Sequence, residues 1–260
     1  SVFSDVSILT GLNDVRDIAN VVKDMKEEGT LVVDKVEGKN ALYLPTFYKM
    51  ETEVAEKLLS EERRVYDESL YDSIGDEEIR KQSRFALTDE QVRAVKQGLI
   101  EPSSIVTGLP GTGKTTILNT LCRSLIERKE KILLVAPTGI AAKRVASLTG
   151  LEAMTIHRAF GAGMPDDEKK EKSDYEGIKK GEDDSLNTKG ESDRHKESWR
   201  HHPQNPRSES VVIIDEASMV DLHLMWRLLR GISPSCRVVM VGDIAQLPPV
   251  GAGVALQEII

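Results

Sequence analysis

A glycine-rich run with one lysine and two threonines is the first segment of this sequence whose residue types suit chemistry. The run GLPGTGKT, at 108–115, follows an apolar stretch and opens a helical one. In that context glycines let backbone N–H groups turn toward a phosphate, and the positive end of the helix adds to the attraction. The pattern therefore predicts an ATP site that includes Gly108, Pro110, Gly111, Thr112, Gly113, Lys114, Thr115 and Thr116.

Lys114 and Thr115 carry the side chains that would act on the nucleotide. We expect Lys114 to contact the β and γ phosphates and to assist catalysis, and the Thr115 hydroxyl to bind Mg2+. The alternative is a glycine-rich turn with a chance lysine. A β run before the loop and a helical pattern after it argue against that alternative.

Two adjacent acids, Asp215 and Glu216, end a second apolar run, VVII at 211–214. A strand that ends in this way would deliver Asp215 to the same Mg2+ as a second protein ligand. Glu216 would then lie where a carboxylate can accept a proton from the attacking water, which makes it a candidate catalytic residue. An acidic pair after a strand also occurs at helix starts, where negative charge is favoured. The P-loop upstream favours the catalytic interpretation.

A parallel sheet is needed to bring these residues together. Helical patterns at 114–128, 141–147 and 222–229 alternate with apolar runs at 105–107, 132–136, 211–214 and 238–241. This alternation predicts an α/β fold, with a parallel sheet flanked by helices. Strands that are apolar throughout suit the interior of such a sheet.

The first part of the chain differs in charge and pattern. Acidic residues outnumber basic ones across 1–90, whereas the reverse holds across 108–160. A helical pattern at 13–28, β runs at 31–36 and 41–44 around a turn, and a helical pattern at 46–64 follow one another. We therefore predict a small helical domain with a β-hairpin at 1–84, ending in a charged connection at 67–84. The second domain then spans 85–260, with a boundary near Phe85.

The segment 163–209 is dense in charged and small polar residues and nearly lacks aliphatic ones. Such a composition cannot bury enough apolar surface to fold alone, so we expect a solvated insertion. Three histidines, His195, His201 and His202, lie within it and leave metal binding as an alternative. The cysteines, Cys122 and Cys236, lie in apolar segments without metal-ligand spacing and are expected to be buried thiols.

Four further segments resemble, in order and spacing, the RecD-like branch of superfamily 1 helicases, the family of the exodeoxyribonuclease V alpha subunit. They are APTGIAAKRV at 136–145, TIHRAF at 155–160, DEASMVD at 215–221 and GDIAQLPPVGAG at 242–253. The resemblance implies a RecA-like P-loop fold and an ATP-dependent DNA helicase. It further implies movement on single-stranded DNA from 5′ to 3′, in DNA repair and recombination.

The resemblance also implies roles for single residues. LTDEQVRAV at 87–95 is similar to the family's adenine-recognition motif, so Gln91 would read the base, although an ordinary polar helix residue is the alternative. Gln246 would sense the γ-phosphate during catalysis, with Asp243 coupling nucleotide state to DNA. Contacts to DNA are implied for Thr138, Gly139, His157 and Arg158. Histidine also serves structural roles, and Lys143 and Arg144 suit a solvated helix face equally well.

Several classes of protein are disfavoured. The net charge of -8 argues against a protein that coats nucleic acid through bulk positive charge. No signal peptide and no apolar run of about 20 residues is found, so we expect a cytoplasmic protein without a membrane contact. A P-loop kinase would need acceptor-pocket and lid residues that we do not find. A nucleotide-dependent regulatory or assembly module, with the acidic first domain binding a protein partner, is the open alternative.

Members of this family place a second motor domain after the GDxxQLPP segment, and it supplies arginines that act on the transferring phosphate. The chain ends at Ile260, shortly after that segment. Such an arginine is worth about three to five orders of magnitude in rate in P-loop enzymes. We therefore expect these 260 residues alone to bind ATP but to hydrolyse it poorly, and not to unwind DNA.

Overall fold

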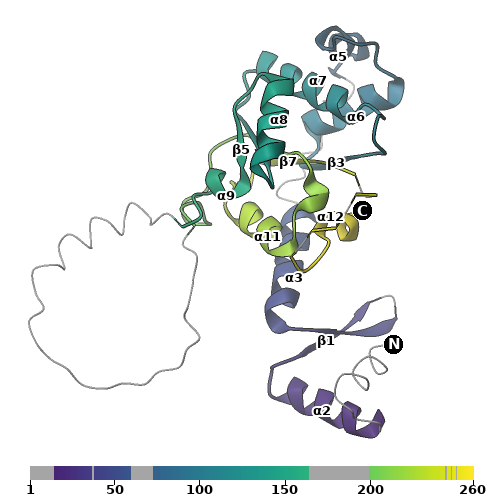
Figure 1. Ribbon diagram of the computed structural model, residues 1–260, viewed down its shortest axis with the longest axis vertical. Helices are drawn as coiled ribbons and strands as arrows, with labels where there is room; N and C mark the ends of the chain where they lie inside the picture. Colours follow the sequence, from purple (N-terminus) through teal and green to yellow (C-terminus); the bar gives the residue numbers. More distant parts are fainter. Residues whose placement is uncertain are drawn as a thin grey trace, which may run out of the picture. The chain divides into compact units, whose positions relative to one another are not determined.

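The computed structural model describes residues 15–36, 38–59, 73–163, 199–243, 245–246, 248–249 and 251–260. The chain forms two compact units, Ser1–Ala55 and Glu56–Ile260. Each unit has its own secondary structure (Figure 1), and each is described by itself.

The first unit contains a helix, a hairpin and the start of a second helix. Helix α2 (Val15–Glu27) precedes the antiparallel strands β1 (Val32–Val36) and β2 (Lys39–Tyr43), and helix α3 (Pro45–Leu59) follows. Gly38, with a φ of 77°, takes the left-handed conformation that a tight hairpin turn requires. Strand β2 therefore begins two residues earlier than predicted, while the predicted helix and hairpin are confirmed. Positions 13–14, where the predicted helix starts, lie outside the described residues.

The second unit is built on one sheet of five parallel strands, so the predicted α/β class is confirmed. The strands lie in the order β3-β7-β6-β4-β5. They span Ser103–Thr107 (β3), Ile132–Ala136 (β4), Ala153–Thr155 (β5), Val211–Ile214 (β6) and Arg237–Gly242 (β7). Every residue of β6 is buried, as expected of a strand covered on both faces. The short edge strand β5 was not predicted, because three half-buried residues carry too little pattern.

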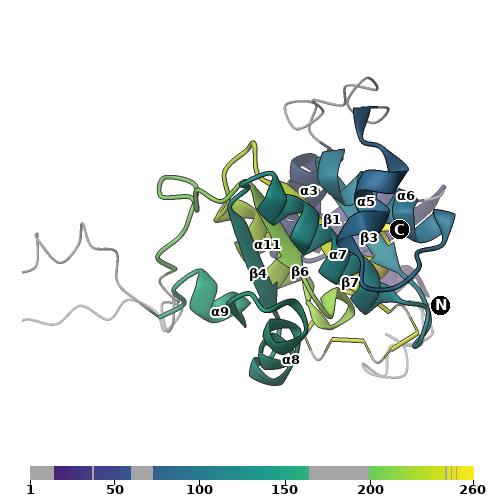
Figure 2. The same ribbon diagram turned by 90° about the horizontal axis from the view of Figure 1, so that it is seen from above.

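Helices cover both faces of this sheet. Figures 1 and 2 show α7 and α8 on one face and α11 on the other. Along β6, Val211 and Ile213 pack in one apolar cluster with Leu121 of α7, as the alternation of side chains in a strand requires. The helices are α5 (Asp76–Gln82), α6 (Asp89–Ile100), α7 (Lys114–Glu127), α8 (Gly139–Thr149), α9 (Ile156–Ala159), α11 (Leu222–Arg230), α12 (Ala255–Ile259) and the 3-10 turn η2 (Ala217–Met219).

The division between the units differs from the predicted boundary near Phe85. The units divide between Ala55 and Glu56, and α5 lies in the second unit. Ile79 of α5 is 1% exposed and belongs to the same apolar cluster as the core of α7. The charged residues around Ile79 gave no apolar pattern in the sequence, so its burial was not predicted. Of the predicted charged connection, residues 67–72 lie outside the described residues.

The end of the predicted insertion, 199–209, packs against the second unit at Trp199 and Arg207, although 200, 203–206 and 208 are exposed. Trp199 is buried at 5% exposure. Arg207 pairs with Glu209, and its Nη1 donates a hydrogen bond to the Ala159 carbonyl at 2.6 Å. The hydrogen bond from Arg207 is the main reason that the pKa of Glu209 is lowered. Residues 164–198 of the predicted insertion, with His195, lie outside the described residues.

Two other expectations concern metals and membranes. In the described parts of the chain, which leave out His195, no three His, Cys, Asp or Glu side chains cluster as a metal site would require. Cys122 and Cys236 are buried, as predicted, and burial raises the pKa of Cys122 to about 12. No helix among the described residues is long and apolar enough to cross a bilayer.

Candidate nucleotide-binding site

The P-loop lies between strand β3 and helix α7. Gly111 and Gly113 have φ values of 84° and 93°, in the left-handed region that glycine adopts without strain. A second constraint also requires glycine at position 113, because a Cβ there would lie 2.3 Å from Nε2 of Gln91. Helix α7 begins at Lys114, directly after the loop. Its first backbone N–H groups therefore lie at the end of the loop, where they can bind an anion.

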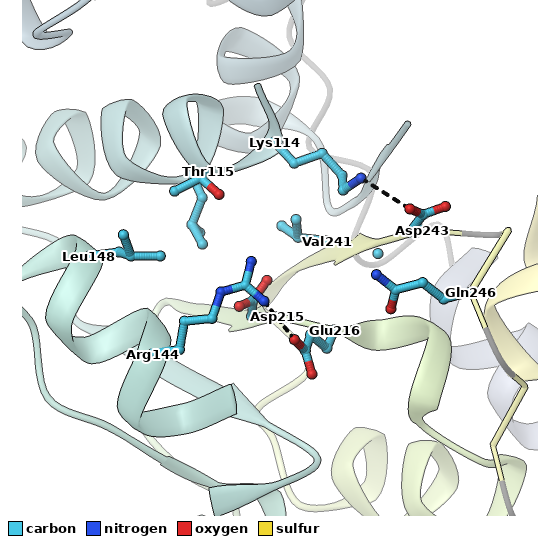
Figure 3. Close-up of a pocket in the computed structure, with 11 residues that line it drawn as sticks. Lys114, Thr115, Arg144, Leu148, Asp215, Glu216, Val241, Asp243 and Gln246 are labelled. Carbon is cyan, nitrogen blue, oxygen red and sulfur yellow. Dashed lines mark hydrogen bonds and ion pairs between the residues drawn. The ribbon is translucent and has the colours of Figure 1, made fainter. Parts of the chain in front are cut away.

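Strand order explains why the catalytic candidates meet. Strand β7 lies between β3 and β6, so the segments that follow these three parallel strands emerge at one edge of the sheet. One pocket at this edge brings together Lys114, Thr115, Asp215, Glu216 and Gln246 (Figure 3), whereas Thr116 of the predicted ATP site lines a second cavity. Its wall consists of Lys114, Thr115, Leu118, Arg144, Leu148, Asp215, Glu216, Val241, Gly242, Asp243 and Gln246.

Lys114 is bound by its own loop and by a buried acid. Its Nζ lies 3.6 Å from Oδ2 of Asp243, a residue that is 2% exposed. The same ammonium donates to the carbonyls of Gly108 and Leu109, the latter at 3.1 Å. A triphosphate in the pocket would offer stronger, charged acceptors than these carbonyls. Lys114 is therefore positioned to exchange its loop partners for phosphate oxygens.

The two adjacent acids differ in environment. Burial is the main cause that raises the pKa of Asp215, and the charge of Glu216 raises it further, while a hydrogen bond from the Glu216 backbone and the charges of Arg144 and Lys114 lower it. Glu216 has a φ of 53°, which is rare and strained for a residue other than glycine. Its Oε1 accepts a hydrogen bond from Nη1 of Arg144 at 2.9 Å. The charged form of Asp215 is thus disfavoured mainly by burial, and Glu216 is held by an ion pair with Arg144.

The donor set of the pocket suits Mg2+. The Thr115 hydroxyl and the Asp215 carboxylate line the same pocket and are hard oxygen ligands. Mg2+ in nucleotide sites takes one or two such protein ligands, with phosphate oxygens and waters completing its shell. The cation would neutralise phosphate charge and would relieve the electrostatic penalty on Asp215. Thr115 and Asp215 are the residues that would hold it.

The structure places Gln91 against the P-loop backbone. Its Nε2 donates to the Thr112 carbonyl at 3.2 Å, and its Oε1 accepts from the Thr88 amide at 3.1 Å in a capping box. A separate cavity of about 310 Å³ lies beside α7. It is lined by Gln82, Ser83, Arg84, Phe85, Thr115, Thr116, Asn119, Thr120, Arg123, Ser147 and Leu148.

Phe85 is the part of this second cavity that the sequence could have shown. It is 70% exposed, which is unusual for a large aromatic side chain unless it serves a ligand or partner. The signal was an isolated aromatic residue in the charged run before Leu87. Asn119 and Arg123, one helical turn apart on α7, gave no signal because polar residues on a helix are ordinary.

The residues predicted to contact DNA lie apart from the nucleotide pocket but at the same edge of the sheet. Thr138 follows β4 and caps α8, its Oγ1 accepting from the Ala141 amide at 3.2 Å, and Gly139 is exposed beside it. His157 and Arg158 are exposed on α9, which follows β5. Strands β4 and β5 are parallel neighbours, so both pairs follow adjacent strand ends. The His157 ring also lies 5.6 Å from that of Trp199.

Comparison with known proteins agrees with this geometry. The AAA domain family matches residues 91–252. The ATP-dependent RecD2 DNA helicase of Deinococcus radiodurans is 30% identical over 221 residues, which are 84% of this chain and 26% of that protein. The RecBCD enzyme subunit RecD of Haemophilus influenzae is 35% identical over 175 residues, 66% of this chain and 26% of that protein.

A third relative is matched over a similar part of its length. The RecBCD enzyme subunit RecD of Mycolicibacterium smegmatis is 33% identical over 195 residues, 66% of this chain and 30% of that protein. The chain thus spans less than a third of the length of these curated relatives. The matched family segment includes the P-loop, the Asp215–Glu216 pair and Gln246. The chain therefore belongs to the AAA domain family and, within it, to the RecD-like superfamily 1 helicases.

Proposed function

We propose that this chain is the ATP-binding part of the first motor domain of a DNA helicase that moves along single-stranded DNA. One observation carries the proposal: Lys114, Thr115, Asp215, Glu216 and Gln246 line one pocket at the edge where three parallel strands end. Lys114 binds phosphate, Thr115 and Asp215 hold its metal ion, and Glu216 and Gln246 beside them suit hydrolysis rather than storage of a nucleotide.

Hydrolysis in this pocket would follow from the positions of its side chains. Lys114 exchanges the Gly108 and Leu109 carbonyls for β and γ phosphate oxygens. Glu216 accepts a proton from a water as the oxygen of that water bonds to the γ phosphorus. The bond from phosphorus to the bridging oxygen breaks, which yields ADP and phosphate. Gln246, on the wall of the same pocket, donates to the γ-phosphate. Mg2+, when bound, neutralises charge on the phosphates.

The DNA track is proposed at the ends of β4 and β5. Thr138 and Gly139 offer a hydroxyl and backbone N–H groups at a helix start, a setting that binds phosphate in many proteins. His157 and Arg158 add polar and positive groups on the exposed side of α9.

The RecD-like resemblance favours 5′ to 3′ movement and a role in repair and recombination. Two relatives are named as subunits of a larger enzyme, which supports a protein partner for the acidic residues of 1–84.

The experiment that tests this proposal uses the intact protein that contains this chain. We expect ATP hydrolysis to be stimulated by single-stranded DNA and a strand to be displaced from a duplex with a 5′ tail but not from one with a 3′ tail. Phosphate contacts weaken with salt, so the assay is run at low ionic strength. Tight ATP binding without any stimulation would contradict the motor and favour the regulatory module.

The cavity beside α7 leads to a prediction about the base. We propose that Phe85 stacks on the nucleobase, because its exposed ring lines a cavity that shares Thr115 with the phosphate pocket. Phe85→Ala should then weaken ATP binding about fivefold, since stacking of a base on an aromatic ring is worth at least about 1 kcal/mol. Fluorescence titration with a labelled ATP measures the effect.

Two controls separate base stacking from a disturbed fold. Phe85→Tyr keeps the ring and should bind ATP like the unsubstituted protein. Tripolyphosphate has no base, so its affinity should be the same for Phe85→Ala and the unsubstituted protein. An equal loss of affinity for ATP and tripolyphosphate would show that Phe85 supports the loop rather than the base.

A further inference from the structure

Arg144 has a place in the structure that its sequence position did not predict. A solvated helix face was one interpretation of Arg144 and Lys143, and the Arg144 side chain is 57% exposed. It also lines the nucleotide pocket, on a different side from Lys114 (Figure 3). Leu148, one turn further along α8, lines the pocket as well. One face of α8 is therefore part of the wall, whereas Lys143 is exposed and does not line the pocket.

The partner of Arg144 is the candidate general base. The guanidinium and the Glu216 carboxylate are 2.9 Å apart, with side chains 57% and 22% exposed. Glu216 reaches this position from a left-handed backbone, a conformation that costs energy in a residue with a Cβ. Such a conformation persists only where surrounding contacts hold it. The ion pair is one of those contacts, and it orients the carboxylate toward α8.

Charges in the pocket are arranged as two ion pairs. Lys114 pairs with Asp243, and Arg144 pairs with Glu216. Lys114 and Arg144 are the lysine and the arginine among the described residues that line the pocket. Lys114 can exchange its ion pair for phosphate oxygens when a triphosphate binds. Hydrolysis can depend on DNA only if the Arg144–Glu216 pair persists at that stage.

Helix α8 also connects this pair to the proposed DNA track. The helix starts at Gly139, immediately after Thr138, and Arg144 lies in its second turn. Thr138 and Arg144 are therefore about 9 Å apart along the helix axis, and we expect the helix between them to move as a rigid body. A shift of α8 caused by DNA phosphate at its first turn would therefore move the Arg144 guanidinium relative to Glu216, because Glu216 follows strand β6 and does not move with α8.

We propose that the Arg144–Glu216 ion pair is a latch that holds the general base toward α8 until single-stranded DNA binds. Arg144 is thus a positioning residue that makes hydrolysis depend on DNA. The inference rests on the proposed function, because it assumes that Glu216 acts in hydrolysis and that the start of α8 contacts the strand. It adds a mechanism by which strand binding controls that step.

The test compares Arg144→Gln with the unsubstituted intact protein. Glutamine keeps polarity but removes the charge, so hydrolysis without DNA should rise about two- to fivefold, as loss of a partly exposed ion pair allows. The rate at saturating DNA should stay within twofold, so the stimulation ratio falls. Arg144→Lys should retain the ratio in part. Lys143→Gln, which changes the neighbouring charge outside the pocket, should leave the ratio unchanged.

Hydrogen exchange provides a measurement that does not depend on turnover. In nucleotide-free protein, amides of 139–149 should exchange faster in Arg144→Gln than in the unsubstituted protein. Equal exchange in the two nucleotide-free proteins would contradict the latch.

The outcomes separate the latch from the motor. An unchanged stimulation ratio in Arg144→Gln, with stimulation present in the unsubstituted protein, overturns the latch and leaves the motor intact. Loss of hydrolysis both with and without DNA, at unchanged ATP affinity, also overturns the latch and makes Arg144 a catalytic residue. Absence of DNA-stimulated hydrolysis in the unsubstituted protein overturns the proposed function and the latch with it.

Discussion

Lys114→Ala is expected to lower ATP affinity about 10- to 100-fold, because hydrogen bonds from a charged donor contribute about 1.5–3 kcal/mol. The turnover number should also fall about 100- to 1000-fold, the usual effect of removing one electrostatic donor from a reacting oxyanion. Lys114 is the first residue of α7 and one wall of the phosphate pocket, so alanine removes the ammonium without changing the loop glycines. Equilibrium binding and steady-state hydrolysis measure the two effects.

A second effect of Lys114→Ala has to be separated from the first. Asp243 is 2% exposed and lies 3.6 Å from the ammonium, so alanine leaves a buried carboxylate without its cation. Removing one partner of a buried pair is strongly destabilising. The double variant Lys114→Ala with Asp243→Asn removes both charges and should regain much of the unfolding free energy. If it also regained ATP affinity, Lys114 would act on folding and not on phosphate.

The phosphate site could be predicted from the sequence because its signals are local. A loop of glycines between a strand and a helix fixes where Lys114 and Thr115 lie, whatever surrounds them. An apolar strand that ends in Asp215 needs only the rule that parallel strands point one way. Once β3, β6 and β7 are parallel, their final residues must meet at one edge. Such predictions depend on few assumptions about distant parts of the chain.

Features that depend on distant contacts could not be predicted in this way. Arg144 and Glu216 are separated by 72 positions, and their pairing depends on the packing of α8 beside the end of β6. The amide of Gln91 reaches Thr112 only because α6 packs beside the P-loop. Trp199 was hidden because the charged residues before it dominate the composition of its segment. In each case the pattern gives the type of element and leaves the partner open.

Glu216→Gln is the most specific test of the chemistry in this pocket. The amide has the shape of the carboxylate and can still accept a hydrogen bond from Arg144, but it cannot take a proton from water at neutral pH. Loss of a general base lowers rates about 100- to 10,000-fold. Glu216 is not a predicted ligand of phosphate or Mg2+, so ATP affinity should stay within a few-fold.

A large loss of hydrolysis rate with ATP affinity retained distinguishes Glu216 from its neighbours. Asp215→Asn should instead weaken the dependence of ATP binding on Mg2+, because Asp215 is the candidate metal ligand in the pocket. A single-turnover measurement with saturating DNA isolates the chemical step from product release. If Glu216→Gln retained more than about a tenth of the single-turnover rate, a loss far smaller than removal of a general base causes, the proton would have to go elsewhere. The latch would then have no base to hold, since Arg144 would be restraining a residue that takes no part in the reaction.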